Sequence, residues 1–202
     1  ILLHGGGSYG HPLAKKYDLA AGYHVPSQLE GVGVTHQSMV ELNHLVMKAL
    51  QKADVRAMSF APSALFITHQ GRISSASLEP LSAALRMGIR PILYGDIVFD
   101  SKSGFTILSG DQLISYLAMA FDAARVLIGT DTDGVFTANP KLFPDAKLIP
   151  SISKANIDEI SKGLGASESI DVTGGMQGKL QELLQISKPD REIVIFNATI
   201  PG

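Results

Sequence analysis

The sequence predicts an α/β protein, a three-layer αβα sandwich with a mainly parallel central sheet. Short apolar runs typical of strands alternate with longer segments whose apolar residues recur at helical spacing. Runs of this apolar kind indicate a sheet that helices cover on both faces. Polar, glycine-bearing segments follow several of the runs, where the carboxyl ends of parallel strands would hold a ligand. With 45% apolar and 18% charged residues, we expect a single domain over residues 1–202.

The strands are predicted from short apolar runs bounded by turn residues. In chain order they are residues 1–3, 55–60, 65–67, 72–73, 91–94, 97–99, 105–108, 125–129 and 192–196. The first run is expected to be the end of a buried strand. Two pairs of runs predict hairpins, one turning at Gln70-Gly71 and the other around residues 100–104.

The helices are predicted from apolar residues that recur every three or four positions. In chain order they are residues 35–53, 77–87, 111–121 and 174–187. The apolar face of the first helix consists of Met39, Leu42, Leu45, Val46, Ala49 and Leu50. In the second helix we expect Ser77 to act as the cap, Pro80 to fall in the first turn and Gly88 to end the helix.

Composition and charge exclude several classes of protein. The formal net charge of −2 argues against a general nucleic-acid-binding protein, which normally presents a basic face. The absence of cysteine excludes disulfides and thiolate chemistry and favours a cytoplasmic location. No apolar run approaches the roughly 18 residues that a membrane span needs, and no signal-peptide pattern is present, so we expect no membrane association.

Two glycine-rich segments carry the main functional signal. One occupies residues 4–11 and ends in His11, and the other occupies residues 171–179 and ends in Lys179. Loops rich in unshielded backbone N–H groups, above all at helix N-termini, are suited to holding phosphate oxygens. Two such segments suggest a site for two phosphorylated molecules, and hence phosphoryl transfer.

The common nucleotide-binding fingerprints are absent. A P-loop places four residues between its first glycine and the Gly-Lys pair, but only three separate Gly174 from Gly178, and Leu180 stands where Ser or Thr is required. No dinucleotide-binding G-x-G-x-x-G follows a predicted strand, and no His or carboxylate cluster has metal-ligand spacing, so no metal ligand is assigned.

The chain resembles the amino-acid kinase superfamily and, within it, the isopentenyl phosphate kinases. The matching segments are residues 4–12, 33–43, 94–96, 109–111, 130–134 and 171–179. The most specific of them are residues 171–179 and the histidine, His11, that ends the first glycine segment. The family also begins with a Lys-x-Gly-Gly-Ser strand, which this sequence does not contain, and continues beyond Gly202. We therefore expect a longer full chain that includes the lysine strand and the family's C-terminal end.

The resemblance implies an ATP- and Mg²⁺-dependent enzyme that phosphorylates isopentenyl phosphate in isoprenoid biosynthesis. The acceptor phosphate would be held by His11 and by the backbone N–H groups of Gly6 and Gly110. The catalytic residues would be His11, Asp111 and Lys179, with Asp111 orienting Lys179 or helping a Mg²⁺ ion. ATP would be bound by Gly7, Asp131, Gly175 and Lys179.

Structural alternatives apply to each of these side chains. His11 could make only a local bond near a helix start, Lys179 could be a solvated lysine, and Asp111 could be a helix-start carboxylate favoured by the dipole. Two other functions stay open: a kinase of the same fold for a phosphonate antibiotic, an acylated amino acid or a nucleoside monophosphate, and a non-catalytic nucleotide-binding subunit. The resemblance also implies a homodimer.

Overall fold

The computed structural model describes residues 1–153, 156, 160 and 175–200. Its contacts divide the chain into two compact units, Ile1–Leu113 and Ile114–Gly202, so that the boundary falls within one helix. Each unit is described by itself. The single-domain assignment over residues 1–202 stays a prediction.

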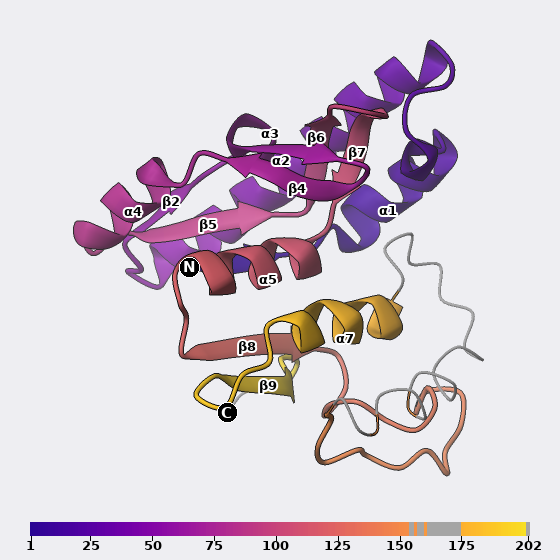
Figure 1. The fold of residues 1–202 in the computed structure, drawn as a ribbon, viewed down its shortest axis with the longest axis vertical. Coiled ribbons are helices and arrows are strands. Elements are labelled where there is room, and N and C mark those ends of the chain that lie inside the picture. Colours follow the sequence, from indigo (N-terminus) through magenta and orange to yellow (C-terminus); the bar gives the residue numbers. More distant parts are fainter. Residues whose placement is uncertain (154–155, 157–159, 161–174, 201–202) are drawn as a thin grey trace. The chain divides into compact units, whose positions relative to one another are not determined.

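The N-terminal unit contains most of the helices and strands in Figure 1. In chain order they are β1 (Leu2–His4), α1 (Gly7–Lys16), the 3-10 helix η1 (Leu19–Ala21), α2 (Ser27–Lys52), β2 (Ala57–Ser59), α3 (Pro62–Leu65), β3 (Phe66–His69), β4 (Arg72–Ala76), α4 (Glu79–Arg86), β5 (Arg90–Tyr94), β6 (Asp96–Asp100), β7 (Gly104–Leu108) and the start of α5 (Gly110–Ala120).

In the N-terminal unit, the strand pairs outside the two predicted hairpins are parallel. The strands β1, β5 and β2 form a parallel sheet in that order, with Leu2 opposite Ile92 and Ser59 also opposite Ile92. A second sheet has the order β4-β3-β6-β7, in which β3 and β6 are parallel. Antiparallel pairing belongs to the two predicted hairpins, β3–β4 and β6–β7. The α/β class is therefore confirmed.

The first hairpin turns where the sequence predicts, at Gln70-Gly71. Both residues have positive φ, 51° and 76°. Positive φ at both central residues is the geometry of the two-residue turn whose twist matches that of the flanking strands.

Helix α2 differs from its prediction in length and in its buried face. It begins at Ser27 rather than at residue 35. Its buried residues follow helical spacing but are mostly polar or small: Gln28, Gly31, Thr35, Met39 and Asn43. Leu45, predicted to be apolar core, is 50% exposed. Two kinds of contact explain the difference: Tyr17 at the end of α1 leaves no room for a side chain at Gly31, and Asn43 donates a hydrogen bond to Ser59 of β2.

Two local expectations in this unit are wrong. Leu2 is exposed rather than buried. Ser77 does not cap α4, because the helix begins only at Glu79 and Leu78 occupies the N-cap position. Pro80 does lie in the first turn.

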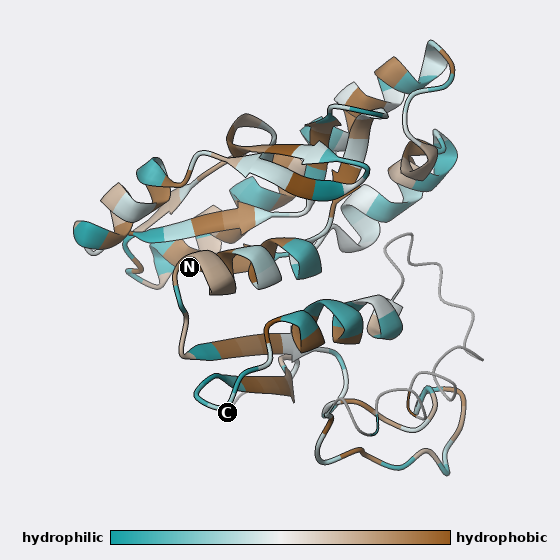
Figure 2. Cartoon of the chain, viewed as in Figure 1, coloured by the Kyte–Doolittle hydropathy of each residue, from teal (hydrophilic) through white to brown (hydrophobic). Residues whose placement is uncertain are grey.

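The C-terminal unit is built around a parallel pair of strands. It contains the rest of α5, β8 (Arg125–Thr130), α7 (Gly175–Gln185) and β9 (Glu192–Asn197). The pairing runs from Arg125 opposite Glu192 to Thr130 opposite Asn197, and both strands are largely hydrophobic in Figure 2. Their core cluster consists of Ala118, Val126, Ile128, Leu183 and Ile186.

Among the described residues, no helix is both long and apolar enough to cross a membrane.

Candidate functional site

The first glycine loop follows β1 and meets two other glycine turns in the N-terminal unit. The Gly95 N–H donates to the His4 carbonyl oxygen at 3.0 Å. A Cβ placed on Gly95 would lie 3.6 Å from the Gly110 nitrogen and 3.9 Å from the Gly6 nitrogen. Gly6 and Gly110, both predicted to hold the acceptor phosphate, are thus brought to the same point.

Both glycines stand at helix N-termini. Gly6 is the N-cap of α1, and Gly110 is the first residue of α5. Ser109 caps α5, because its hydroxyl accepts the Gln112 N–H at 3.1 Å and its carbonyl accepts the Leu113 N–H at 3.0 Å. The first N–H groups of a helix have no acceptor within the helix, and the helix dipole favours an anion there. The convergence of two such ends suits a phosphate group.

Helix α2 packs against the first glycine loop and the start of α1. The Ser38 hydroxyl donates to the Tyr9 carbonyl oxygen at 3.1 Å. A Cβ on Gly6 would lie 3.3 Å from the Met39 Sδ, and a Cβ on Gly10 only 2.9 Å from the same atom. Because Gly6 and Gly10 carry no side chain, the loop and the first turns of α1 can approach α2 this closely.

His4 contacts two neighbouring elements, β5 and α2, a role that the sequence did not predict. Its ring stacks on Tyr94 of β5 at 5.4 Å between centroids. Its Nε2 lies 3.3 Å from the Asn43 Oδ1 on α2, and the Asn43 amide donates to the Ser59 hydroxyl at 2.6 Å. These contacts fix the position at which β1 passes into the glycine loop.

His11 and Asp111 occupy different positions relative to their helix starts. The predicted loop to His11 is shorter than expected, because α1 begins at Gly7 and His11 is the fifth residue of that helix. His11 is half-buried one turn after Gly7. Asp111 is half-buried in the first turn of α5, directly after Gly110.

A second feature that sequence reasoning missed is the pair formed by His36 and Asp96. The His36 Nδ1 lies 2.9 and 3.0 Å from the two Asp96 carboxylate oxygens, and the Asp96 side chain is fully buried. Burial raises the pKa of the Asp96 carboxyl, and the His36 hydrogen bond and charge oppose the shift. Burial, followed by the nearby Asp96 carboxylate, also raises the pKa of Tyr94 to about 12. Asp96 lies in the matching segment 94–96 and His36 in the segment 33–43, but no spacing rule links a residue at the start of β6 to a histidine on α2.

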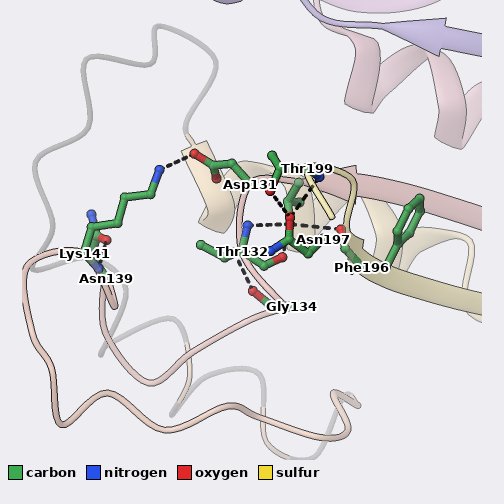
Figure 3. Close-up of polar contacts among 9 residues, drawn as sticks. Asp131, Thr132, Gly134, Asn139, Lys141, Phe196, Asn197 and Thr199 are labelled. Carbon is green, nitrogen blue, oxygen red and sulfur yellow. Dashed lines mark hydrogen bonds and ion pairs between the residues drawn. The ribbon is translucent and has the colours of Figure 1, made fainter. Parts of the chain in front are cut away.

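The C-terminal unit places the predicted Asp131 in a turn with Thr132 and Gly134 (Figure 3). Asp131 is 65% exposed and forms an ion pair with Lys141, which the sequence did not predict. The Lys141 hydrogen bond lowers the pKa of the Asp131 carboxyl. The Thr130 hydroxyl donates to the Thr132 carbonyl oxygen at 2.8 Å, and the Asn197 amide donates to the Asp133 carboxylate at 3.0 Å.

The second glycine segment is described only from Gly175 onward, and residues 171–174 lie outside the described residues. Gly175 begins α7 with a φ of 56°, a conformation that favours glycine. Lys179 is half-buried one turn later. Because His11 and Lys179 belong to different units, their predicted closeness stays a prediction.

A cavity of about 440 Å³ lies beside the turn that contains Asp131, within the C-terminal unit. Its wall includes Asp133 and Gly134 from the turn, Leu180 from α7 and Ile195 from β9.

Within the described ranges, no group of three or more His, Asp or Glu side chains could hold a metal ion by itself.

Comparison with known families gives a match over almost the whole chain. Residues 1–197 match the amino acid kinase family. The isopentenyl phosphate kinase of Methanothermobacter thermautotrophicus is 38% identical, and the alignment covers 100% of this chain and 77% of that protein. Those of Methanocaldococcus jannaschii and Arabidopsis thaliana are 38% and 30% identical. The chain spans 66% and 64% of their respective lengths.

Solved structures give the same result. An X-ray structure of isopentenyl phosphate kinase superposes with a TM-score of 0.83 at 37% identity, covering 99% of this chain and 76% of that one. A substrate complex of isopentenyl phosphate kinase superposes with a TM-score of 0.72 at 26% identity, covering 98% and 74%.

Proposed function

Because the chain belongs to the amino acid kinase family, we propose that it transfers the γ-phosphoryl group of ATP to isopentenyl phosphate, forming isopentenyl diphosphate and ADP. The observation that carries this proposal is the 38% identity to an isopentenyl phosphate kinase over the full length of the chain. The meeting of Gly6, Gly95 and Gly110 supports it independently, because this point suits a phosphate group.

The acceptor side of the reaction belongs to the N-terminal unit. The N–H groups of Gly6 and Gly110 would donate to the phosphate oxygens of isopentenyl phosphate. His11, half-buried on α1, would add a further hydrogen bond and hold the attacking oxygen in line. Such positioning lowers the barrier because the reacting groups are already aligned when they meet.

The nucleotide side would draw on both glycine segments. Gly7 and Gly175, both with positive φ, would present backbone N–H groups to the ATP phosphates. Lys179 would reach the β and γ oxygens from one turn into α7, and Asp131 would border the nucleoside beside the cavity. Phosphoryl transfer needs little covalent chemistry from the protein, so positive charge and positioned donors are sufficient.

Mg²⁺ is part of this proposal, and the described residues fit it. In nucleotide sites Mg²⁺ is held largely by phosphate oxygens and water, with one or two protein carboxylates nearby. Asp111, half-buried in the first turn of α5, would be such a carboxylate or would orient Lys179. When bound, Mg²⁺ neutralises phosphate charge.

We further propose that the protein is cytoplasmic and forms a homodimer. Light scattering at micromolar concentration would test the dimer.

A coupled ADP-release assay on the full chain tests the function. Isopentenyl phosphate is compared with a nucleoside monophosphate, an acylated amino acid and a phosphonate, and the product is identified by mass spectrometry. We expect efficient turnover with isopentenyl phosphate and a product heavier by one phosphoryl group. Preference for another acceptor would reassign the substrate, and nucleotide binding without turnover would indicate a non-catalytic subunit.

A further inference from the structure

The start of α5 has the sequence of a reciprocal cap but uses it differently. Ser109-Gly110-Asp111-Gln112 has the spacing of a capping box, in which the glutamine side chain returns to the N-cap N–H. The serine half of the cap is present, because the Ser109 hydroxyl accepts the Gln112 N–H at 3.1 Å. The Gln112 amide is turned elsewhere.

Both polar atoms of the Gln112 side chain bind the β3–β4 hairpin. The Nε2 donates to the Gly71 carbonyl oxygen at 3.0 Å, and the Oε1 accepts the Ile73 N–H at 3.0 Å. β4 is an outer strand of its sheet, so the side-chain amide pairs with the free edge of β4 as a neighbouring peptide group would. Gln112 is only 8% exposed, and loss of these bonds would leave buried polar groups without partners.

The hairpin is also held from its other side, by Asp100 at the end of β6. Its carboxylate accepts the Gly71 N–H at 2.8 Å and lies 3.3 Å from the Gln70 nitrogen. The same carboxylate accepts the N–H groups of Lys102 and Ser103 at 2.9 and 2.8 Å. These bonds fix the Gln70-Gly71 turn, and the two hydrogen bonds of Gln112 hold the first turn of α5 against it.

We infer that Gln112 is a positioning residue for the acceptor-phosphate site, which it serves by joining the β3–β4 hairpin to the helix start that carries Gly110 and Asp111. Gly110 precedes Gln112 by two residues, and its nitrogen lies at the meeting point with Gly6 and Gly95. A displaced α5 start would move one of the two N–H donors away from the acceptor phosphate. This inference rests on the proposed function for its substrate.

The test compares Gln112→Met and Gln112→Glu with a matched control, Gln37→Met. Methionine keeps the length of the side chain but makes neither hydrogen bond, whereas glutamate keeps an acceptor for the Ile73 N–H. Gln37 is an exposed glutamine on α2, 3.5 Å from Glu41, so its substitution removes the same atoms away from the hairpin.

For Gln112→Met we expect the KM for isopentenyl phosphate to rise about 3–10-fold, with the KM for ATP unchanged. Gln112→Glu should show a smaller rise, and Gln37→Met none. Amide hydrogen exchange without substrate should accelerate about 2–10-fold at Ile73 and Leu113 in Gln112→Met.

Two results would overturn the inference. One is an unchanged acceptor KM in Gln112→Met together with a lower melting temperature, which would indicate a purely structural bond. The other is unchanged exchange at Leu113 despite faster exchange at Ile73, since the hairpin would then not hold the helix start. Failure of the proposed function looks different: the unsubstituted protein would not turn over isopentenyl phosphate, and the same KM comparison would be made with the acceptor it does use.

Discussion

In the N-terminal unit the loops after β1 and β5 are held by main-chain and buried side-chain contacts, whereas in the C-terminal unit the two carboxylates of the turn after β8, Asp131 and Asp133, are exposed. Gly95 and His4 are joined through their backbones, and Met39 packs directly on Gly6. Asp131, by contrast, is 65% exposed and bound to an exposed lysine. Substitutions in the first region should therefore act through shape and burial, and those in the second through weak, solvent-screened charge.

The largest effect is expected for Gly95→Ala. The added methyl group would lie beside the nitrogens of Gly6 and Gly110, where a phosphate oxygen would bind, but at 3.5 Å or more from every neighbour. We expect kcat/KM for isopentenyl phosphate to fall roughly 100-fold, the usual cost of about 1 Å of misplacement. The melting temperature should hardly change, and Gly33→Ala, with no neighbour within 4 Å, serves as the activity control. Full activity in Gly95→Ala would place the phosphate elsewhere.

His11→Ala should give the next largest effect. Loss of one charge-assisted hydrogen bond should reduce kcat/KM for the acceptor by roughly 10–100-fold and leave ATP binding nearly unchanged. Lys179→Ala should instead mainly lower kcat if, as proposed, the charge of Lys179 stabilises the transition state. Steady-state kinetics with each substrate varied in turn separates the two. If His11→Ala raised only the KM for ATP, the assignment of the two sides would be reversed.

A matched pair on α2 tests its close packing against the end of α1. A Cβ on Gly31 would lie 2.4 Å from the Tyr17 Cβ, whereas Gly33 has open space. Gly31→Ala should therefore destabilise the protein by about 1–3 kcal/mol through overpacking. Gly33→Ala should stabilise it by up to about 1 kcal/mol, since alanine favours the helix. Urea denaturation measures both, and equal shifts for the two variants would contradict the packing.

The buried carboxylate of Asp100 makes part of the stability of this unit depend on pH. Backbone N–H bonds, above all that of Gly71, outweigh burial and hold the pKa of Asp100 well below its usual range. Its stabilising effect is therefore complete above the unfolded pKa of about 3.9 and is lost as the pH falls towards the folded value. Asp100→Asn should cost about 1–3 kcal/mol at pH 7, and the difference from the unsubstituted protein should shrink below about pH 4. A difference independent of pH would contradict this origin.

The smallest effect is expected for Asp131→Asn in the exposed turn. Its ion pair with Lys141 should contribute less than about 1 kcal/mol to stability, and less still in high salt. If Asp131 borders the nucleoside, the KM for ATP should rise while that for isopentenyl phosphate stays the same. A change confined to the acceptor KM would count against this placement.

The sequence by itself determined the local features. Apolar runs and turn residues located the strands and both hairpins, and Gln70-Gly71 adopts the positive φ that its turn requires. The glycine loops and the resemblance to the amino-acid kinases led to the fold and to the family, which the comparisons confirm. These features depend on residues that are close together in the sequence, so the types and spacing of those residues predict them.

The tertiary structure alone decided which distant residues meet. The His36–Asp96 pair joins positions 60 residues apart, and the buried face of α2 turned out to be polar and small because of what packs on it. The sequence of Ser109-Gly110-Asp111-Gln112 is that of a capping box, yet its glutamine binds a hairpin about 40 residues earlier. A side-chain amide takes whichever backbone groups the fold leaves free, and local sequence does not specify which groups those are.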